Sequence, residues 1–199
     1  MIVKQMLKCS FIQGSILHRL KYGKGRGQNL AKAVGMRANK NRTIVDATAG
    51  LGYDAFILAS LGANVTLIER SEIMHKLVAD AMLQAKSHGG EVNKIVSRMS
   101  LLFGDSKNIL PGLSPKVILI DTMYKDRKKS ALVKNNMRLI KEIVGSDPDH
   151  IELINIALSF ACNRVVIKQP RYAEPLKGVK PWSHQILGRT IRYDVYMQT

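Results

Sequence analysis

The sequence contains little cysteine and no long apolar stretch. Cys9 and Cys162 are its two cysteines, and their wide separation matches no metal-binding spacing. We therefore expect free thiols, a reducing cytoplasmic environment and no bound metal. No apolar run is long enough to span a membrane, and the N-terminus lacks the apolar region and cleavage site of a signal peptide. The sequence thus predicts a cytoplasmic protein without membrane contact.

Acidic residues are missing from the first 45 positions, although that stretch carries ten Lys and Arg residues. The imbalance continues further along, with seven basic residues against one acid in 123–141 and seven against two in 161–199. The formal net charge is +16. Clustered positive charge is typical of proteins that bind a polyanion, most simply nucleic acid. The alternative is that these basic residues serve only solubility, but this poorly explains a stretch of 45 residues without an acid.

The chain is organised around a strand, a glycine turn and a helix in residues 43–61. Residues 43–47 begin β-branched and apolar, as a buried strand does, and residues 54–61 fit a helix. Between them lie Gly50 and Gly52, whose small size lets a ligand lie against bare backbone at the end of the strand. This is the first unit of a Rossmann-like fold, although a plain tight turn has the same pattern.

The motif lacks the third glycine of a dinucleotide-binding fingerprint, because Ala55 takes its place. It also has an acid, Asp46, inside the end of the strand. A carboxylate there repels the pyrophosphate of a dinucleotide but attracts a cationic ligand. Both features argue against a nicotinamide-dependent oxidoreductase. The strand-end acid followed by A-G-x-G resembles the first motif of methyltransferases that use S-adenosylmethionine (SAM).

Two further strands are followed or ended by acidic residues. Residues 64–69 form a strand ending at Glu69, 17 residues after Gly52, where nucleotide-binding sheets place the carboxylate for the ribose hydroxyls. Its two acceptor oxygens match two vicinal hydroxyls. Residues 99–103 form the next strand, and Asp105 after it suits the adenine amino group, as in SAM enzymes. An ordinary strand-end charge and a turn residue are the alternatives.

The remaining segments complete an alternating pattern. Residues 116–121 form a continuous apolar strand, as a central parallel strand requires, which ends at Asp121. The other expected elements are helices at 28–34, 71–88, 129–144 and 148–161, a strand at 164–168, and a hairpin of strands 183–187 and 190–198. We therefore predict an α/β fold whose seven-stranded, mostly parallel sheet has helices on both faces and a C-terminal antiparallel hairpin.

Residues 1–27 show scattered apolar positions among basic ones, so we expect this stretch to pack poorly. Lys24 and Arg26 alternate with three glycines in residues 23–27, where backbone N–H groups could cradle a phosphate. The spacing does not match a P-loop, and a flexible basic loop has the same composition.

Asp121-Thr122-Met123-Tyr124 stands where amino methyltransferases carry (Asn/Asp)-Pro-Pro-(Tyr/Phe) after the fourth strand. With other stretches across about residues 15–197, the sequence resembles the RsmJ family, SAM-dependent methyltransferases that modify guanine N2 in small-subunit (16S) ribosomal RNA. The matching stretches are 25–28, 31–35, 46–52, 54–56, 58–62, 68–70, 129–134 and 165–168 with Pro170. The resemblance implies a Rossmann-like class I SAM methyltransferase domain at 43–199, preceded by a basic segment at 1–42 that contacts RNA.

The resemblance, taken with the motifs above, assigns roles to individual residues. The expected SAM contacts are Asp46, Gly50, Gly52, Tyr53, Asp54, Glu69, Arg70, Asp105, Ser106 and Asp121. Asp121 and the backbone carbonyl of Thr122 would accept hydrogen bonds from the guanine amine, while Tyr124 would stack on the extruded base. The residues expected to hold RNA are Lys24, Arg26, Lys125, Arg127, Lys128, Lys129 and Lys168. The implied partner is ribosomal RNA or the small ribosomal subunit.

The sequence departs from the family pattern at two of these positions. Tyr53 stands where the family usually has Arg, and Thr122 stands where it has Pro. The chain also starts late and is expected to lack most of the N-terminal extension of the family. Two alternatives therefore stay open: a non-catalytic RNA-binding protein that retains a degenerate SAM fold, and an amino methyltransferase that acts on another RNA base.

Overall fold

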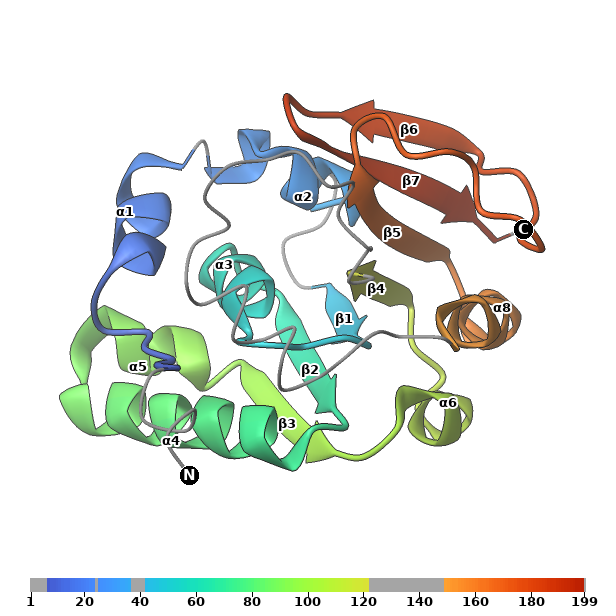
Figure 1. Cartoon of the computed structure of the whole chain (residues 1–199). Helices are drawn as coiled ribbons and strands as arrows, with labels where there is room; N and C mark the ends of the chain where they lie inside the picture. The colour runs from blue at the N-terminus through green and yellow to red at the C-terminus, as the bar shows by residue number, and fades with distance from the viewer. Residues whose placement is uncertain (1–6, 24, 37–41, 122–148, 199) are drawn as a thin grey trace.

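The computed structural model describes residues 7–23, 25–36, 42–121 and 149–198. Within these ranges seven strands form one sheet in the order β3-β2-β1-β4-β5-β7-β6 (Figure 1). The strands are β1 Thr43–Asp46, β2 Asn64–Glu69, β3 Met99–Phe103, β4 Val117–Asp121, β5 Arg164–Pro170, β6 His184–Leu187 and β7 Ile191–Met197. Strands β1 to β5 pair in parallel, and β7 pairs antiparallel with β5 and β6. The predicted mostly parallel sheet with an antiparallel C-terminal hairpin is confirmed.

Continuous apolar runs place β1 and β4 at the centre of the sheet. Ile44 and Val45 of β1 and Ile118 and Ile120 of β4 are all buried, as parallel strands covered on both faces require. The strand order reverses here, because β2 and β3 lie on one side of β1 while β4 and β5 lie on the other. At such a switch point, the crevice outside the carboxyl ends of the strands receives ligands.

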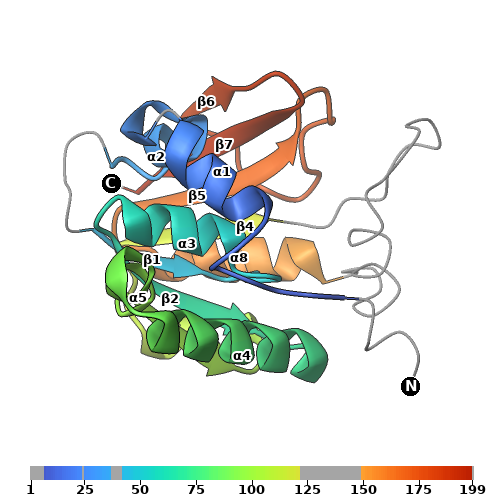
Figure 2. The same ribbon diagram turned by 90° about the vertical axis from the view of Figure 1, so that its left-hand side faces the viewer.

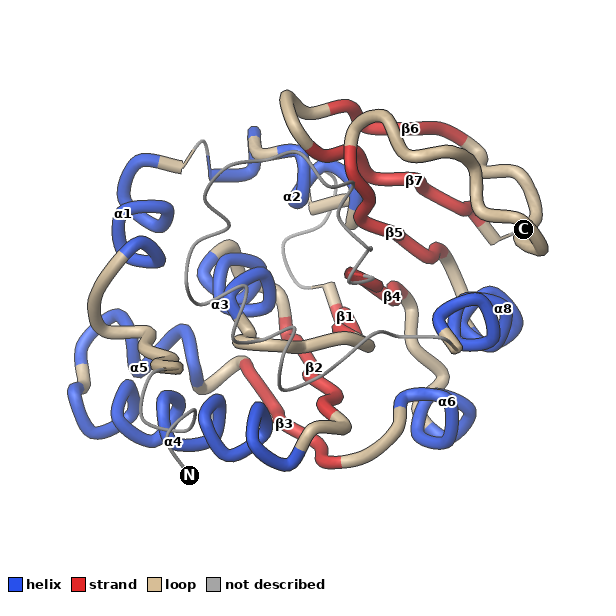
Figure 3. Tube along the Cα trace, viewed as in Figure 1, coloured by secondary structure: helices blue, strands red, loops and turns tan. Residues whose placement is uncertain are grey.

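Helices cover both faces of the sheet, as predicted (Figures 1 and 3). One face carries α1 Ser15–Tyr22, α2 Asn29–Ala33, α3 Tyr53–Ser60, α4 Glu72–His88 and α5 Gly90–Val96, and the other carries α6 Ser106–Ile109 and α8 His150–Phe160. Short 3-10 turns lie at Gly25–Gly27 and Leu110–Gly112. Each face buries its own apolar cluster. In the part of the chain that the structure describes, no helix has the length and apolar character to cross a membrane.

The N-terminal residues pack against the core, so the expected poor packing of residues 1–27 is wrong for the described part. Phe11 is fully buried, and its ring stacks on that of Phe56 in α3 with centroids 4.9 Å apart. Figure 2 shows α1 lying across α3. Ile16 and Leu20 fall one turn apart on α1 and both meet the core. A few apolar side chains on one face suffice to dock a short helix whose sequence is otherwise basic.

Besides α1, two further short helices were not predicted. α5 follows α4 through Gly89, whose φ of 76° lets the chain change direction between the helices. α6 has four residues and is capped by Asp105, which accepts the N–H of Lys107. Helices of this length carry too few positions for an apolar repeat to be recognised. The predicted helix at 129–144 lies outside the described residues.

Candidate functional site

Carboxylates gather at the carboxyl edge of the central strands. Asp46, Glu69 and Asp121 are the last residues of β1, β2 and β4, which are neighbours in the parallel part of the sheet. Asp54 joins them from the first turn of α3, directly after the glycine turn. The carboxyl ends of parallel strands meet at one edge, so the fold brings these predicted residues together.

The two glycines of the turn have different roles. Both have positive φ, 54° at Gly50 and 69° at Gly52, which L side chains rarely adopt. A Cβ on Gly52 would stand 3.0 Å from Leu67 Cδ2 and 3.3 Å from Phe11 Cζ, so this glycine permits close packing of the core. A Cβ on Gly50 would meet only the Thr48 carbonyl at 3.9 Å. Gly50 therefore leaves space where a ligand can approach the backbone.

Glu69 is fixed against the glycine turn by two backbone hydrogen bonds. Its Oε2 accepts the N–H of Gly50 at 2.9 Å and its Oε1 accepts the N–H of Ser71 at 2.7 Å. Burial raises the pKa of Glu69, and these two bonds oppose that rise. Each carboxylate oxygen keeps a further lone pair, so Glu69 is a rigid double acceptor.

Asp46 is the most deeply buried carboxylate of the predicted site, with 3% of its surface exposed. Burial raises its pKa to about 7, and the nearby Asp54 adds to the shift. Its Oδ1 accepts the N–H of Thr48 at 3.2 Å. Thr48 in turn accepts the N–H of Asp121 at 2.6 Å through its hydroxyl, which ties the turn after β1 to the end of β4. Sequence reasoning missed Thr48, because its contact depends on how the strands pair.

Lys168 of β5 joins two of the predicted carboxylates. Its Nζ lies 2.6 Å from Asp121 Oδ2 and 2.8 Å from Asp54 Oδ2, and Arg19 of α1 binds the other oxygen of Asp54 at 2.6 Å. Burial alone would raise the pKa of Asp54, but Lys168 and Arg19 outweigh it and lower that pKa. Burial likewise raises the pKa of Asp121, and Lys168 opposes the rise. Lys168 was predicted to hold RNA, whereas in this structure its ammonium binds two carboxylates.

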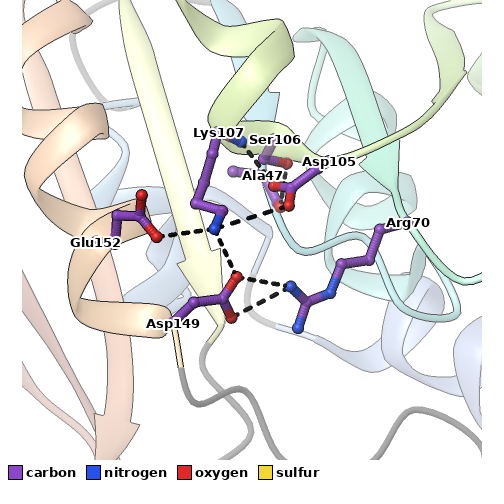
Figure 4. Close-up of polar contacts among 7 residues, drawn as sticks. All are labelled: Ala47, Arg70, Asp105, Ser106, Lys107, Asp149 and Glu152. Carbon is purple, nitrogen blue, oxygen red and sulfur yellow. Dashed lines mark hydrogen bonds and ion pairs between the residues drawn. The ribbon is translucent and has the colours of Figure 1, made fainter.

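Figure 4 shows a second polar network, at the ends of β2 and β3. Arg70, predicted to contact SAM, binds both carboxylate oxygens of Asp149 at the start of α8, at 3.0 and 3.2 Å. Lys107 lies 2.9 Å from Asp149 and 2.8 Å from Glu152. Hydrogen bonds from Lys107 and, to a smaller extent, from Arg70 lower the pKa of Asp149 to about 2. This network ties α8 to the loops after β2 and β3.

Two more predicted SAM contacts belong to the same network. Asp105 accepts the N–H of Lys107 at 2.9 Å through Oδ1, and its Oδ2 lies 3.9 Å from the ammonium of the same lysine (Figure 4). The hydroxyl of Ser106 is buried and donates to the Ala47 carbonyl at 2.6 Å. Ser106 thus fixes the turn after β1 through its side chain. Its backbone remains at the carboxyl edge beside Asp105.

Of the other predicted residues, Tyr53 adjoins the glycine turn, Arg26 lies apart from the carboxyl edge, and the rest lie outside the described ranges. Tyr53 begins α3 and meets Phe11 edge to face at 6.2 Å, and burial raises its pKa. Arg26 donates to the Leu61 carbonyl at 3.0 Å, at the end of α3 remote from the glycine turn, so it does not reach the site. Lys24, Thr122, Tyr124, Lys125, Arg127, Lys128 and Lys129 lie outside the described residues.

Cys9 and Cys162 are free thiols, as predicted. Across the described ranges, no cluster of His, Cys, Asp and Glu has the arrangement of a metal site. The carboxyl edge presents fixed carboxylates, one bridging ammonium and an open glycine turn. Such a site suits a ligand that carries vicinal hydroxyls and positive charge.

Comparison with known proteins identifies the family. Residues 2–198 match the model of a family of SAM-dependent methyltransferases, SAM_MT. The chain is 54% identical over 192 residues to the ribosomal RNA small subunit methyltransferase J of Brucella anthropi, an alignment that covers 96% of this chain and 94% of that protein. The protein of the same name from Agrobacterium fabrum is 52% identical, over 94% of this chain and 90% of that protein.

Solved structures agree with these relatives. A SAM-dependent methyltransferase from Neisseria gonorrhoeae superimposes with a TM-score of 0.75 at 33% identity, covering 96% of this chain and 74% of that chain. An RNA methyltransferase from Salinibacter ruber, solved with S-adenosyl-L-homocysteine, shares the fold with a TM-score of 0.51 at 12% identity, over 84% of this chain and 88% of that chain. The resemblance seen in the motifs is confirmed, and the chain belongs to the ribosomal RNA small subunit methyltransferase J family of SAM-dependent methyltransferases.

Proposed function

We propose that this chain transfers a methyl group from SAM to the exocyclic N2 amine of a guanine in small-subunit ribosomal RNA, in the cytoplasm. The observation that carries the proposal is the set of fixed carboxylates at the carboxyl edge. Glu69 and Asp46 flank the open glycine turn, and Asp121 is held beside them by Lys168. The printed names of the relatives support ribosomal RNA as the substrate, free or in the assembled subunit.

The residues at the glycine turn fit SAM by their chemistry. Glu69 presents two fixed acceptor oxygens, which suit the two ribose hydroxyls. Gly50 leaves open space against the backbone. Asp46 offers a carboxylate to the ammonium of the methionine part, and Asp105 offers an acceptor to the adenine amine. When bound, SAM supplies a methyl group on a positively charged sulfur.

Asp121 is the residue that we assign to the guanine amine. The lone pair of this amine is delocalised into the ring, so the reaction depends on positioning more than on acid or base catalysis. A carboxylate that accepts the amine N–H localises the lone pair and offsets the positive charge that develops on nitrogen. Lys168 binds Oδ2 and favours the ionised carboxylate, so we assign the amine contact to Oδ1. Thr122 and Tyr124 keep their predicted roles as carbonyl acceptor and stacking partner.

The test is methyl transfer from tritiated SAM to small subunits taken from a strain that lacks this protein, followed by nucleoside analysis. The wild-type chain should produce N2-methylguanosine. Asp121→Asn should lower the rate by about 100-fold or more, since it removes the negative charge that stabilises the transition state. The variant should keep the melting temperature of the wild type to within a few degrees.

Three results would contradict the proposal, each in a different way. Retained turnover by Asp121→Asn would remove Asp121 from the chemistry. A methylated nucleoside other than N2-methylguanosine would favour an enzyme for another base. Failure of the wild-type chain to bind SAM in calorimetry would favour a non-catalytic RNA-binding protein.

A further inference from the structure

The loop after β5 and the β6–β7 turn lie together at the edge of the sheet that carries the site. Pro170, the last residue of β5, pairs with Ile191 at the start of β7, and the N–H of Arg171 donates to the Thr190 carbonyl at 2.9 Å. Figure 2 shows both connections on the side to which the arrowheads of β1 and β2 point. Tyr172 lies in the turn that follows Pro170, the last residue of β5.

Tyr172 is 85% exposed, which is unusual for a large ring. The guanidinium carbon of Arg171 lies 5.8 Å from the centroid of this ring, and Arg189 and Leu187 in the neighbouring turn are exposed. Arg171 and Arg189 supply positive charge on these two connections, whereas Lys180, in the same stretch of sequence, contacts Gln198 near the opposite edge of the sheet. An open ring among positive charges is the composition of a single-stranded nucleic acid platform.

The loop that carries Tyr172 is braced from beneath by a buried arginine. Arg192 is 5% exposed, pairs with Asp194 at 2.9 Å, and donates to the carbonyls of Arg171 and Ala173 at 3.2 and 2.6 Å. Arg171 in turn donates to the Gly188 carbonyl of the β6–β7 turn at 2.9 Å. The exposed ring thus stands on a loop held by hydrogen bonds from the buried Arg192 and by one to the Gly188 carbonyl, so little ordering entropy is lost when a base stacks on it.

We propose that Tyr172, with Arg171 and Arg189, forms a platform for the single-stranded RNA next to the target nucleotide. The inference rests on the proposed function. A base beside the extruded guanine stacks on the ring of Tyr172, and the two arginines contact its flanking phosphates. The position of the platform at the site edge orients the strand toward Asp121.

Binding of a 16S ribosomal RNA transcript, followed by fluorescence anisotropy, tests the platform. Tyr172→Ala should weaken binding by about 5- to 150-fold, because a stacked base contributes about 1–3 kcal/mol. Tyr172→Phe, which keeps the ring, should bind like the wild type. In methylation assays Tyr172→Ala should raise KM with kcat unchanged, and its SAM affinity in calorimetry should not change.

The charge contribution has a matched control in Lys180, whose Nζ contacts Gln198 near the opposite edge of the sheet. Arg189→Ala should reduce the salt dependence of RNA binding by about one phosphate contact, whereas Lys180→Ala should leave it unchanged.

The platform is overturned if Tyr172→Ala binds RNA like the wild type, or if Tyr172→Phe is as weak as Tyr172→Ala. A variant that binds naked RNA normally but fails on assembled subunits would indicate a ribosomal protein partner instead. If the wild-type chain binds no RNA, the proposed function itself fails.

Discussion

Asp46 is a single residue whose buried carboxylate lowers the stability of the folded protein at neutral pH. Its carboxyl group is almost fully buried, and its pKa of about 7 lies well above the ordinary value of 3.8. Between these two values the folded protein keeps a proton that the unfolded chain loses. The free energy of unfolding therefore falls as the pH rises through this window and levels off above about pH 7.

Asp46→Asn should raise the free energy of unfolding at pH 8 by about 1–4 kcal/mol, at roughly 1.4 kcal/mol per pKa unit, and change it little at pH 4. Asparagine keeps an oxygen for the Thr48 N–H and removes the charge. Urea denaturation at the two pH values measures the difference, and calorimetry should show weaker SAM binding. Equal stability of the two proteins at pH 8 would mean that no buried charge develops at this position.

The sequence predicted those candidate site residues whose position is determined by their own strand. Glu69 and Asp121 are the last residues of apolar strands, so their meeting at one edge follows from parallel pairing alone. Lys168 is different, because its partners depend on the β4–β5 register, in which Asp121 and Lys168 are opposite each other. Arg19 could not be predicted either, since its contact with Asp54 requires α1 to dock on α3.

At the scale of elements, α1 and the preceding residues are part of the core and support the glycine turn. The ring of Phe11 stacks on Phe56 and lies 3.3 Å from where a Cβ of Gly52 would stand. The strands and long helices were predictable from apolar periodicity. The docking of α1 was not, because three or four apolar side chains in a basic segment give no clear period. Its burial arises from tertiary packing.

Phe11→Ala should lower the free energy of unfolding by about 3–5 kcal/mol, as expected for truncation of a buried phenylalanine. Phe11→Leu should cost less because it leaves a smaller cavity. Denaturation in urea gives both values, and the alanine variant should also bind SAM more weakly because the turn at Gly52 loses its support. A loss below about 1 kcal/mol would show that the segment is an appendage that the core does not need.

At the scale of the whole molecule, the net charge of +16 makes association with RNA depend on salt. The logarithm of the affinity for a 16S ribosomal RNA transcript should fall linearly with the logarithm of KCl concentration. A slope between about −2 and −5 corresponds to three to seven phosphate contacts at about −0.7 each. SAM affinity measured over the same range should change far less. A flat RNA curve would mean that the positive charge has no part in substrate binding.

The ammonium of Lys168 is shared between Asp54, on the helix after the glycine turn, and Asp121, at the end of β4. A ligand that binds one of these two carboxylates weakens its ion pair with Lys168, and this changes the strength of the ion pair between Lys168 and the other carboxylate. We therefore expect ligand binding beside Asp54 and ligand binding beside Asp121 to be thermodynamically linked, with a reciprocal linkage. The ligand that binds first therefore changes the electrostatic field at the binding site of the second ligand.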